Sequence, residues 1–426
     1  MNNRLKRSLA YVFWGGVSTS AVDTLVVGPT LFAYAAFFGA GDIAFGILGA
    51  VPYFGNLAHL FSAWLIEHGF SIRKTAFYTA FISRFFLLIA ALLAFKPNMP
   101  GALEILILIL TLNYLIGCIS GGVWLPWMKT LIPARIMGRF FSFRFKYMMV
   151  AKVICFWFSA LLLKYGVSFV PQDKEIYIYA FLFIIAFIIG LFSAWTLSQV
   201  EDKKQVSVSN SLSFIQKVKT CLMNKPFRNL LFTLSFTNFT VAFITPFVTV
   251  FMLKYLEIPM STILIFTLIM QLTYTLVIKK LGKIADKEDT LKVLKLSVPL
   301  LLLSLLGFLI INQFTLGLYT TYAVLIIAHI ILGIATAGIA LGINNASLIY
   351  VPKESSAIYL SVNSVVKSFA GVVASILAGV TLSLCTLLET SFANRWTVFW
   401  SISVFIAVVS YYTIIVFKSS LKKGTK

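Results

Sequence analysis

The feature that most constrains this chain is a series of apolar stretches, each long enough to cross a lipid bilayer. A transmembrane helix needs about 20 apolar residues, and the 426-residue sequence holds about twelve stretches of that kind. Charged residues make up only 12% of the chain, whereas soluble domains carry about 25%. The sequence therefore excludes a water-soluble globule and predicts an all-α membrane protein with twelve transmembrane helices.

The predicted spans form two groups of six. One long polar connection separates the groups, and within it residues 212–222 predict a short amphipathic helix on the membrane surface. We expect an N-terminal six-helix bundle over residues 1–198, a cytoplasmic central loop over 199–227 and a C-terminal six-helix bundle over 228–426. The spans are expected near residues 11–38, 43–66, 75–95, 103–125, 143–163, 176–197, 229–253, 261–277, 291–311, 318–341, 357–384 and 395–417.

The basic residues predict which way the spans cross the membrane. The chain holds 35 Lys and Arg against 14 Asp and Glu. Of these basic residues, 27 fall in one alternating set of loops together with the two termini, and five fall in the other set. Because positively charged loops stay in the cytoplasm, both termini are expected on the cytoplasmic side of a prokaryotic cytoplasmic membrane. Anionic lipid, rather than nucleic acid, is the expected partner of this charge.

The two halves of the chain repeat each other in sequence. The segments that begin at Pro133 and Pro352 share a small residue, an aromatic residue and a serine at matching places, 219 residues apart. Glu67 and Asp286 are separated by the same 219 residues. Several matches at one spacing predict two pseudo-symmetric bundles, which is typical of transporters built from parallel repeats.

Together these features resemble the major facilitator superfamily (MFS), and the resemblance covers essentially the whole chain. Residues 282–287 (Gly-Lys-Ile-Ala-Asp-Lys) are similar to the start of the family's loop signature between the second and third spans of a half. Asp289 stands where that signature has a later glycine. The fifth span lacks the family's Gly-rich antiporter signature, which disfavours a drug–proton antiporter.

The resemblance implies rocker-switch alternating access, in which ion pairs at helix ends break when one bundle moves against the other. The alternative is that the same charges serve only topology and solvation at the membrane surface. The residues that match the family's gating positions are Glu67, Arg73, Arg139, Arg144, Gly282, Asp286 and Lys292.

Three ionisable residues are predicted deep inside spans. Asp23 lies about 20 Å along the first helix, near mid-bilayer, where an unpaired charge costs at least about 2.5–3.5 kcal/mol. Lys152 and Lys367 lie at similar depth in the fifth and eleventh spans. Asp23 is expected to contact substrate or carry a proton, and the two lysines to favour an anionic or zwitterionic solute. Structural ion pairing is the alternative for all three.

Other polar side chains belong to spans that line the central cavity in the family, or share a face with Lys367. They are Asn113, Trp124, Asn238, His329 and Asn363. His329 is a second candidate for proton coupling. Helix packing is the alternative for each of them, because small and polar residues also mediate helix contacts in lipid. Arg84 is interpreted as structural, because the third span is peripheral in the family.

No enzyme, cofactor or metal motif is visible, and the four cysteines show neither disulfide nor zinc spacing. We therefore expect a monomeric, non-enzymatic secondary active transporter without cofactor. It is predicted to move a small organic solute, preferably anionic or zwitterionic, with protons as the coupling ion and membrane lipid as surroundings. The alternative is an efflux pump or flippase for a lipophilic compound or lipid, and a remote alternative is a non-transporting membrane sensor.

Overall fold

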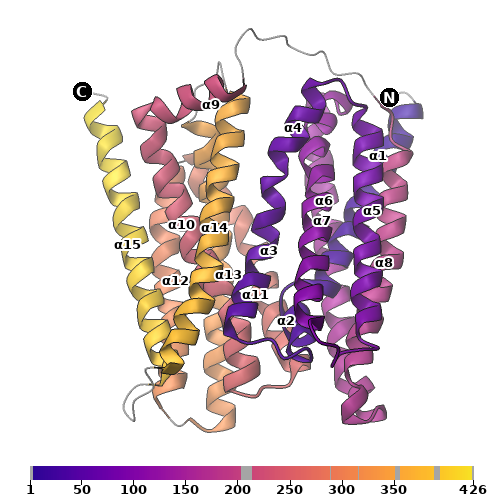
Figure 1. Cartoon of the computed structure of the whole chain (residues 1–426). Helices are drawn as coiled ribbons and strands as arrows, with labels where there is room; N and C mark the ends of the chain where they lie inside the picture. The colour runs from indigo at the N-terminus through magenta and orange to yellow at the C-terminus, as the bar shows by residue number, and fades with distance from the viewer. Residues whose placement is uncertain are drawn as a thin grey trace. The chain divides into compact units, whose positions relative to one another are not determined.

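The computed structural model describes residues 3–202, 214–287, 289–314, 316–350, 356–387 and 394–424. Within these ranges the chain is helical and contains no strand. Twelve helices or helix pairs are long and apolar enough to cross a membrane, which confirms the predicted all-α architecture (Figure 1). The predicted linker residues 203–213 lie outside the described ranges.

The first six spans are built from eight helices because two spans are interrupted. The first breaks at Gly28, whose φ of 66° favours glycine, and Pro29 then starts a new helix. The second breaks at Ala58. The helices are α1 (Asn3–Val26), α2 (Pro29–Ala36), α3 (Asp42–Leu57), α4 (His59–Glu67), α5 (Ile72–Leu93), α6 (Ala102–Leu131), α7 (Ala134–Gly166) and α8 (Ile176–Ser198).

The last six spans follow a short helix on the central connection. That helix is α9 (Phe214–Met223), which packs against α10 and α14. The spans are α10 (Lys225–Val250), extended by a π-helical turn to Tyr255, and then α11 (Met260–Lys287), α12 (Thr290–Gln313), α13 (Leu318–Ile349), α14 (Ser356–Leu387) and α15 (Arg395–Gly424).

The predicted end of the eighth span, at Val277, is wrong. Helix α11 continues to Lys287 although its last three turns are rich in lysine. Leu281 and Ala285 on these turns are buried in a cluster with Val293 and Ala337. The polar segment therefore forms an amphipathic extension of the span, which a search for continuous apolar sequence does not detect.

The described chain divides into two compact units. The first comprises Met1–Gly41, Val51–Asn210 and Ile258–Leu264, and the second comprises Asp42–Ala50, Ser211–Glu257 and Ile265–Lys426. The boundary therefore cuts through α3, whose first two turns belong to the second unit. Pro52 lies inside α3, just beyond this boundary.

The two units use the same pattern of helix packing. In the first, α5 packs against α6 and α8, and α1 packs against α7 and α8. In the second, α12 packs against α13 and α15, and α10 packs against α14 and α15. The corresponding spans pack together in each unit: the third span contacts the fourth and the sixth, and the first span contacts the fifth and the sixth. The pseudo-symmetry that the sequence repeat predicts is thus present in the packing.

Candidate functional site

Asp23 lies in the last turn of α1, just before the break at Gly28 within the first span, and interacts electrostatically with charged groups on two other helices of the first unit. Its electrostatic partners are Arg84 on α5 and Lys152 on α7. The Asp23 side chain is exposed, although Val22 and Thr24 on either side of it are buried. An accessible carboxylate at mid-span, faced by two cations, is an arrangement that can bind an ionised solute or a proton.

Arg84 is the partner that the sequence interpretation missed. Its side chain packs on α8, where a Cβ added to Gly190 would lie 2.5 Å from the Arg84 Cδ. The Nε atom of Arg84 is buried and has no hydrogen-bond partner within the described part of the chain. An unsatisfied buried guanidinium donor is costly, and it is free to bind an acceptor. Arg84 therefore belongs to the Asp23 group.

Helix α6 contributes further polar groups to this part of the first unit. Tyr114 and Cys118 both interact electrostatically with Asp23, and the Cys118 thiol lies 3.9 Å from Asn56 Oδ1. Asn113, on the same helix, is buried, and its Oδ1 has no hydrogen-bond partner among the described residues. The first unit thus holds one carboxylate, two cations and several neutral polar groups.

In the second unit, Lys367 lies half-buried on α14 without a carboxylate partner among the described residues. Asn238 of α10 donates from Nδ2 to the Lys367 carbonyl oxygen at 2.9 Å. Four residues earlier, Asn363 Nδ2 donates to Ser347 Oγ at 2.6 Å, which ties α14 to α13. Asn238 and Asn363 therefore fix the helix that carries Lys367.

His329 does not fit its predicted place on a cavity. The side chain is 2% exposed, and its ring lies between Phe266 and Phe308, with centroids 5.5 and 5.9 Å away. Its Nδ1 is 2.8 Å from the Leu325 carbonyl oxygen. Aromatic side chains and its own helix enclose the imidazole, so the described geometry gives it no access to solute.

Arg144 and Trp124 form a pair at one end of the first unit. Arg144 Nε donates to the Val12 carbonyl oxygen at 3.2 Å, and its guanidinium lies over the Trp124 ring at 4.7 Å from the centroid. Gly16 on α1 lies directly under the same guanidinium. Trp124 was predicted as a cavity residue, but here it stacks with Arg144 at the end of α6.

The chain can be placed among known proteins from its sequence. The family model of the Major Facilitator Superfamily matches residues 13–375. This chain belongs to the Major Facilitator Superfamily. No curated protein matches the sequence, so the superfamily, and not a particular relative, is what the comparison establishes: the protein is a transporter of this superfamily.

Solved structures show the same fold at low sequence identity. The D323A mutant of the nucleoside transporter NupG has a TM-score of 0.74 at 14% identity, covering 96% of this chain and 99% of its own. A D-xylose–proton symporter has a TM-score of 0.71 at 13% identity, covering 97% of each chain. A bacterial homologue of the human lysosomal transporter Spinster, inward-facing and unoccupied, has a TM-score of 0.70 at 13% identity, covering 99% of this chain and 98% of its own.

The other residues matched to the gating loops of the superfamily occupy varied environments. Asp286 and Arg139 are exposed, whereas Arg73 and Lys292 are partly buried. Lys292 has an interaction partner. A Cβ added to Gly282 would meet nothing within 4 Å. The Glu67 side chain lies outside the described part of the structure.

Asp289, which stands where the loop signature has a glycine, makes an ion pair and two hydrogen bonds that the sequence interpretation did not predict. Its carboxylate caps α12 by accepting from the Leu291 amide at 3.0 Å, accepts from the Tyr350 hydroxyl at 3.0 Å and pairs with Lys418 at 3.0 Å. Burial acts to raise the Asp289 pKa, but these hydrogen bonds and Lys418 outweigh it and lower the pKa. Burial and the neighbouring carboxylate raise the pKa of Tyr350 to about 12.

A second ion pair joins α3 and α15 within the second unit. Arg395 Nη1 lies 3.0 Å from Asp42 Oδ2. Close packing supports it, because a Cβ on Gly46 would lie 2.6 Å from the Ser375 carbonyl oxygen, and one on Gly379 would lie 2.5 Å from the Asp42 carbonyl oxygen. Ser375 Oγ also donates to the Gly46 carbonyl oxygen at 2.9 Å. The first two turns of α3 are thus fixed on α14 and α15.

Proposed function

We propose that this transporter moves a small organic anion or zwitterion together with protons by rocker-switch alternating access. The observation that carries the proposal is the grouping of Asp23 with Arg84 and Lys152. Alone among the fourteen acidic residues, Asp23 lies more than two turns from either end of a described span. A carboxylate at this depth is stable only when it is paired, protonated or solvated, so its state is coupled to what binds beside it.

The charge balance of the group supports an anionic or zwitterionic solute. With Asp23 ionised, two cations face one carboxylate, which leaves one positive charge for a solute carboxylate or phosphate. Protonation of Asp23 would leave both cations without a negative partner and would therefore strengthen the binding of an anion. Binding of the solute would then be coupled to binding of a proton. Taken by itself, the second unit holds one cation deep in a span, Lys367, without an acidic partner among the described residues.

We further propose that both termini and the basic loops face the cytoplasm, because basic residues concentrate in one alternating set of loops. The membrane is then the cytoplasmic membrane of a prokaryote. Cysteines introduced singly near the N-terminus and into the opposite loops test this orientation. A membrane-impermeant thiol reagent added to intact cells should label only the latter, and labelling of the N-terminal cysteine would contradict the proposal.

The solute class is tested by thermal unfolding of the purified transporter in detergent at pH 6 and pH 8. The probes are carboxylates, amino acids, sugar phosphates, neutral sugars and nucleosides. A ligand at about 100 times its Kd stabilises the folded state by about 2.7 kcal/mol, which raises Tm measurably. We expect stabilisation by anionic or zwitterionic probes only. Stabilisation by neutral or cationic probes alone would overturn the proposed class.

Substitutions then separate this function from export of a lipophile. Lys152→Met and Lys367→Met should each abolish the Tm shift and uptake into proteoliposomes, whereas a lipophile pump would keep its activity. Asp23→Asn should keep solute binding but uncouple it from the pH gradient, as measured with a trapped pH-sensitive dye. Proton movement that persists in Asp23→Asn would remove Asp23 from the coupling role.

A further inference from the structure

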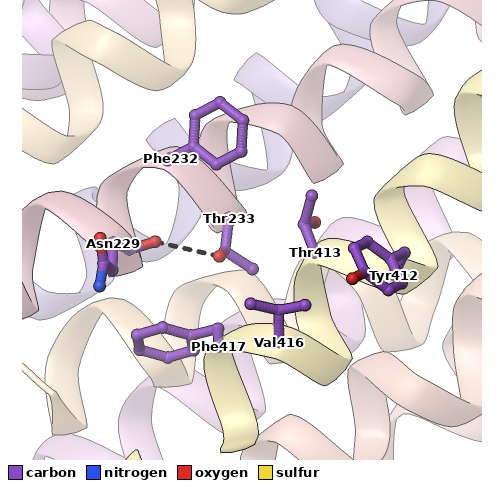
Figure 2. Close-up of a pocket in the computed structure, with 7 residues that line it drawn as sticks. All are labelled: Asn229, Phe232, Thr233, Tyr412, Thr413, Val416 and Phe417. Atoms are coloured by element: carbon purple, nitrogen blue, oxygen red, sulfur yellow. Dashed lines mark hydrogen bonds between the residues drawn. The ribbon is translucent and has the colours of Figure 1, made fainter. Parts of the chain in front are cut away.

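A groove in the second unit lies between α10 and α15. It has a volume of about 290 Å³ and is lined by Asn229, Phe232, Thr233, Tyr412, Thr413, Val416 and Phe417. Figure 2 shows Phe232 and Thr233 of α10 on one side and Thr413 and Val416 of α15 on the other. The first and the last span of the C-terminal half therefore line the groove.

The groove has a buried floor and an exposed apolar rim. Thr233 and Phe417 are only 3% and 4% exposed, whereas Phe232 and Tyr412 are 61% and 65% exposed. The threonine hydroxyls donate to their own helices, Thr233 to the Asn229 carbonyl at 3.0 Å and Thr413 to that of Ser410 at 2.8 Å. Because these hydroxyls are already satisfied, the groove favours an apolar occupant.

Basic residues stand beside one end of this groove. Arg228 directly precedes the lining residue Asn229, and Lys225 begins the same helix one turn earlier. Both side chains are exposed. Lys418 follows the lining residue Phe417, but it is paired with Asp289. An apolar groove at membrane depth that ends beside exposed cations matches a phospholipid with an acidic headgroup.

We propose that this groove binds one acyl chain of an anionic phospholipid, whose headgroup is held by Arg228 and Lys225. The volume equals that of about ten water molecules in the liquid, which suits a segment of one chain and excludes a whole lipid. The exposed rings of Phe232 and Tyr412 flank the chain, and the basic end sets the leaflet. The site is separate from the Asp23 group and does not depend on the proposed solute.

The test is native mass spectrometry of the full-length transporter with added lipid. The probes are phosphatidylglycerol and phosphatidylcholine with identical chains at equal concentration. We expect at least fivefold greater retention of phosphatidylglycerol. Val416→Trp, which fills the groove, should lower retention of both lipids at least threefold. Val408→Trp is its control, because Val408 is similarly exposed on the same helix.

Arg228→Gln tests the headgroup contact with little risk to folding, since it changes an exposed side chain. It should lower phosphatidylglycerol retention at least threefold, leave phosphatidylcholine retention unchanged and leave Tm in lipid-free detergent unchanged. Lys280→Gln, at an exposed position on α11, should resemble the wild type. Equal retention of the two lipids, equal behaviour of the two tryptophan variants, or a dimer that forms in place of lipid binding would each overturn the proposal.

Discussion

The guanidinium of Arg395 lies 3.0 Å from the carboxylate of Asp42, although the two residues are 353 positions apart in the chain. Their side chains are only 25% and 16% exposed. The pair joins the first turn of α3 to the first turn of α15, so it fixes an N-terminal helix onto the C-terminal half. Desolvation offsets much of the attraction within a partly buried pair, whereas removing one partner leaves the other charge unpaired, and that loss is costly.

Removing either partner of this pair should lower thermal stability, and the two effects should not add. For Asp42→Asn, Arg395→Gln and the double variant, we expect a coupling energy of about 1 kcal/mol, measured by unfolding in detergent. The exchange Asp42→Arg with Arg395→Asp should recover part of the loss. Independent, additive effects would show that the contact contributes nothing to stability.

Gly379→Ala should destabilise the transporter by about 1–3 kcal/mol, because the added methyl group would meet the backbone of α3 rather than a flexible side chain. Gly282→Ala is the matched control, since it also lies within a helix but has open space around it. The control should be neutral or stabilising by up to about 1 kcal/mol. The difference in Tm between the two variants is the measurement, and equal values would contradict the close packing of α3 on α14.

The ion pair between Asp289 and Lys418 should make stability depend on pH. The native pKa of Asp289 lies below its ordinary value, so its stabilising effect is complete above that ordinary value and is lost as pH falls through the native pKa. Asp289→Asn keeps an N-cap acceptor but loses the charge, at a cost of about 0.5–1 kcal/mol near neutral pH. The Tm difference from the wild type should shrink as pH falls below the ordinary aspartate pKa of about 3.9. Asp286→Asn, which removes a charge at an exposed position, is the control variant.

Arg144→Lys should lower stability by about 1–2 kcal/mol, because an ammonium cannot both donate to Val12 and stack on the Trp124 ring in the same geometry. Gly16→Ala should act on the same contact, since the new methyl group would displace the guanidinium. The double variant should therefore be no less stable than the worse single variant. Lys146→Gln, exposed on the same helix, serves as the control, and a comparable loss there would assign the effect to charge alone.

Sequence reasoning predicted the architecture because apolar length and loop charge are local properties. The twelve spans and the repeat follow from them, and both are present in the structure. It did not name Arg84 as a partner of Asp23, because periodicity on one helix does not show which other helix lies beside it. The electrostatic interaction of Arg84 with Asp23 depends on the packing of α1 and α5 against α8.

His329 shows the opposite error. The sequence interpretation placed it in a span that lines the cavity, and Gly333 lies one turn further along the same helix. In the structure a Cβ on Gly333 would lie 2.5 Å from the Met270 carbonyl oxygen, so the glycine marks close helix packing. Asp289, by contrast, carried a usable signal, because an aspartate directly before a helix is a common N-cap.

The division of α3 between two units has a mechanical consequence. Proline has no amide hydrogen, so Pro52 leaves the Leu48 carbonyl without its usual helical bond, close to where the helix passes from one unit to the other. A helix bends most easily where its ladder of backbone hydrogen bonds is interrupted. Residues 48–52 are therefore the part of α3 that can bend at the lowest cost in free energy.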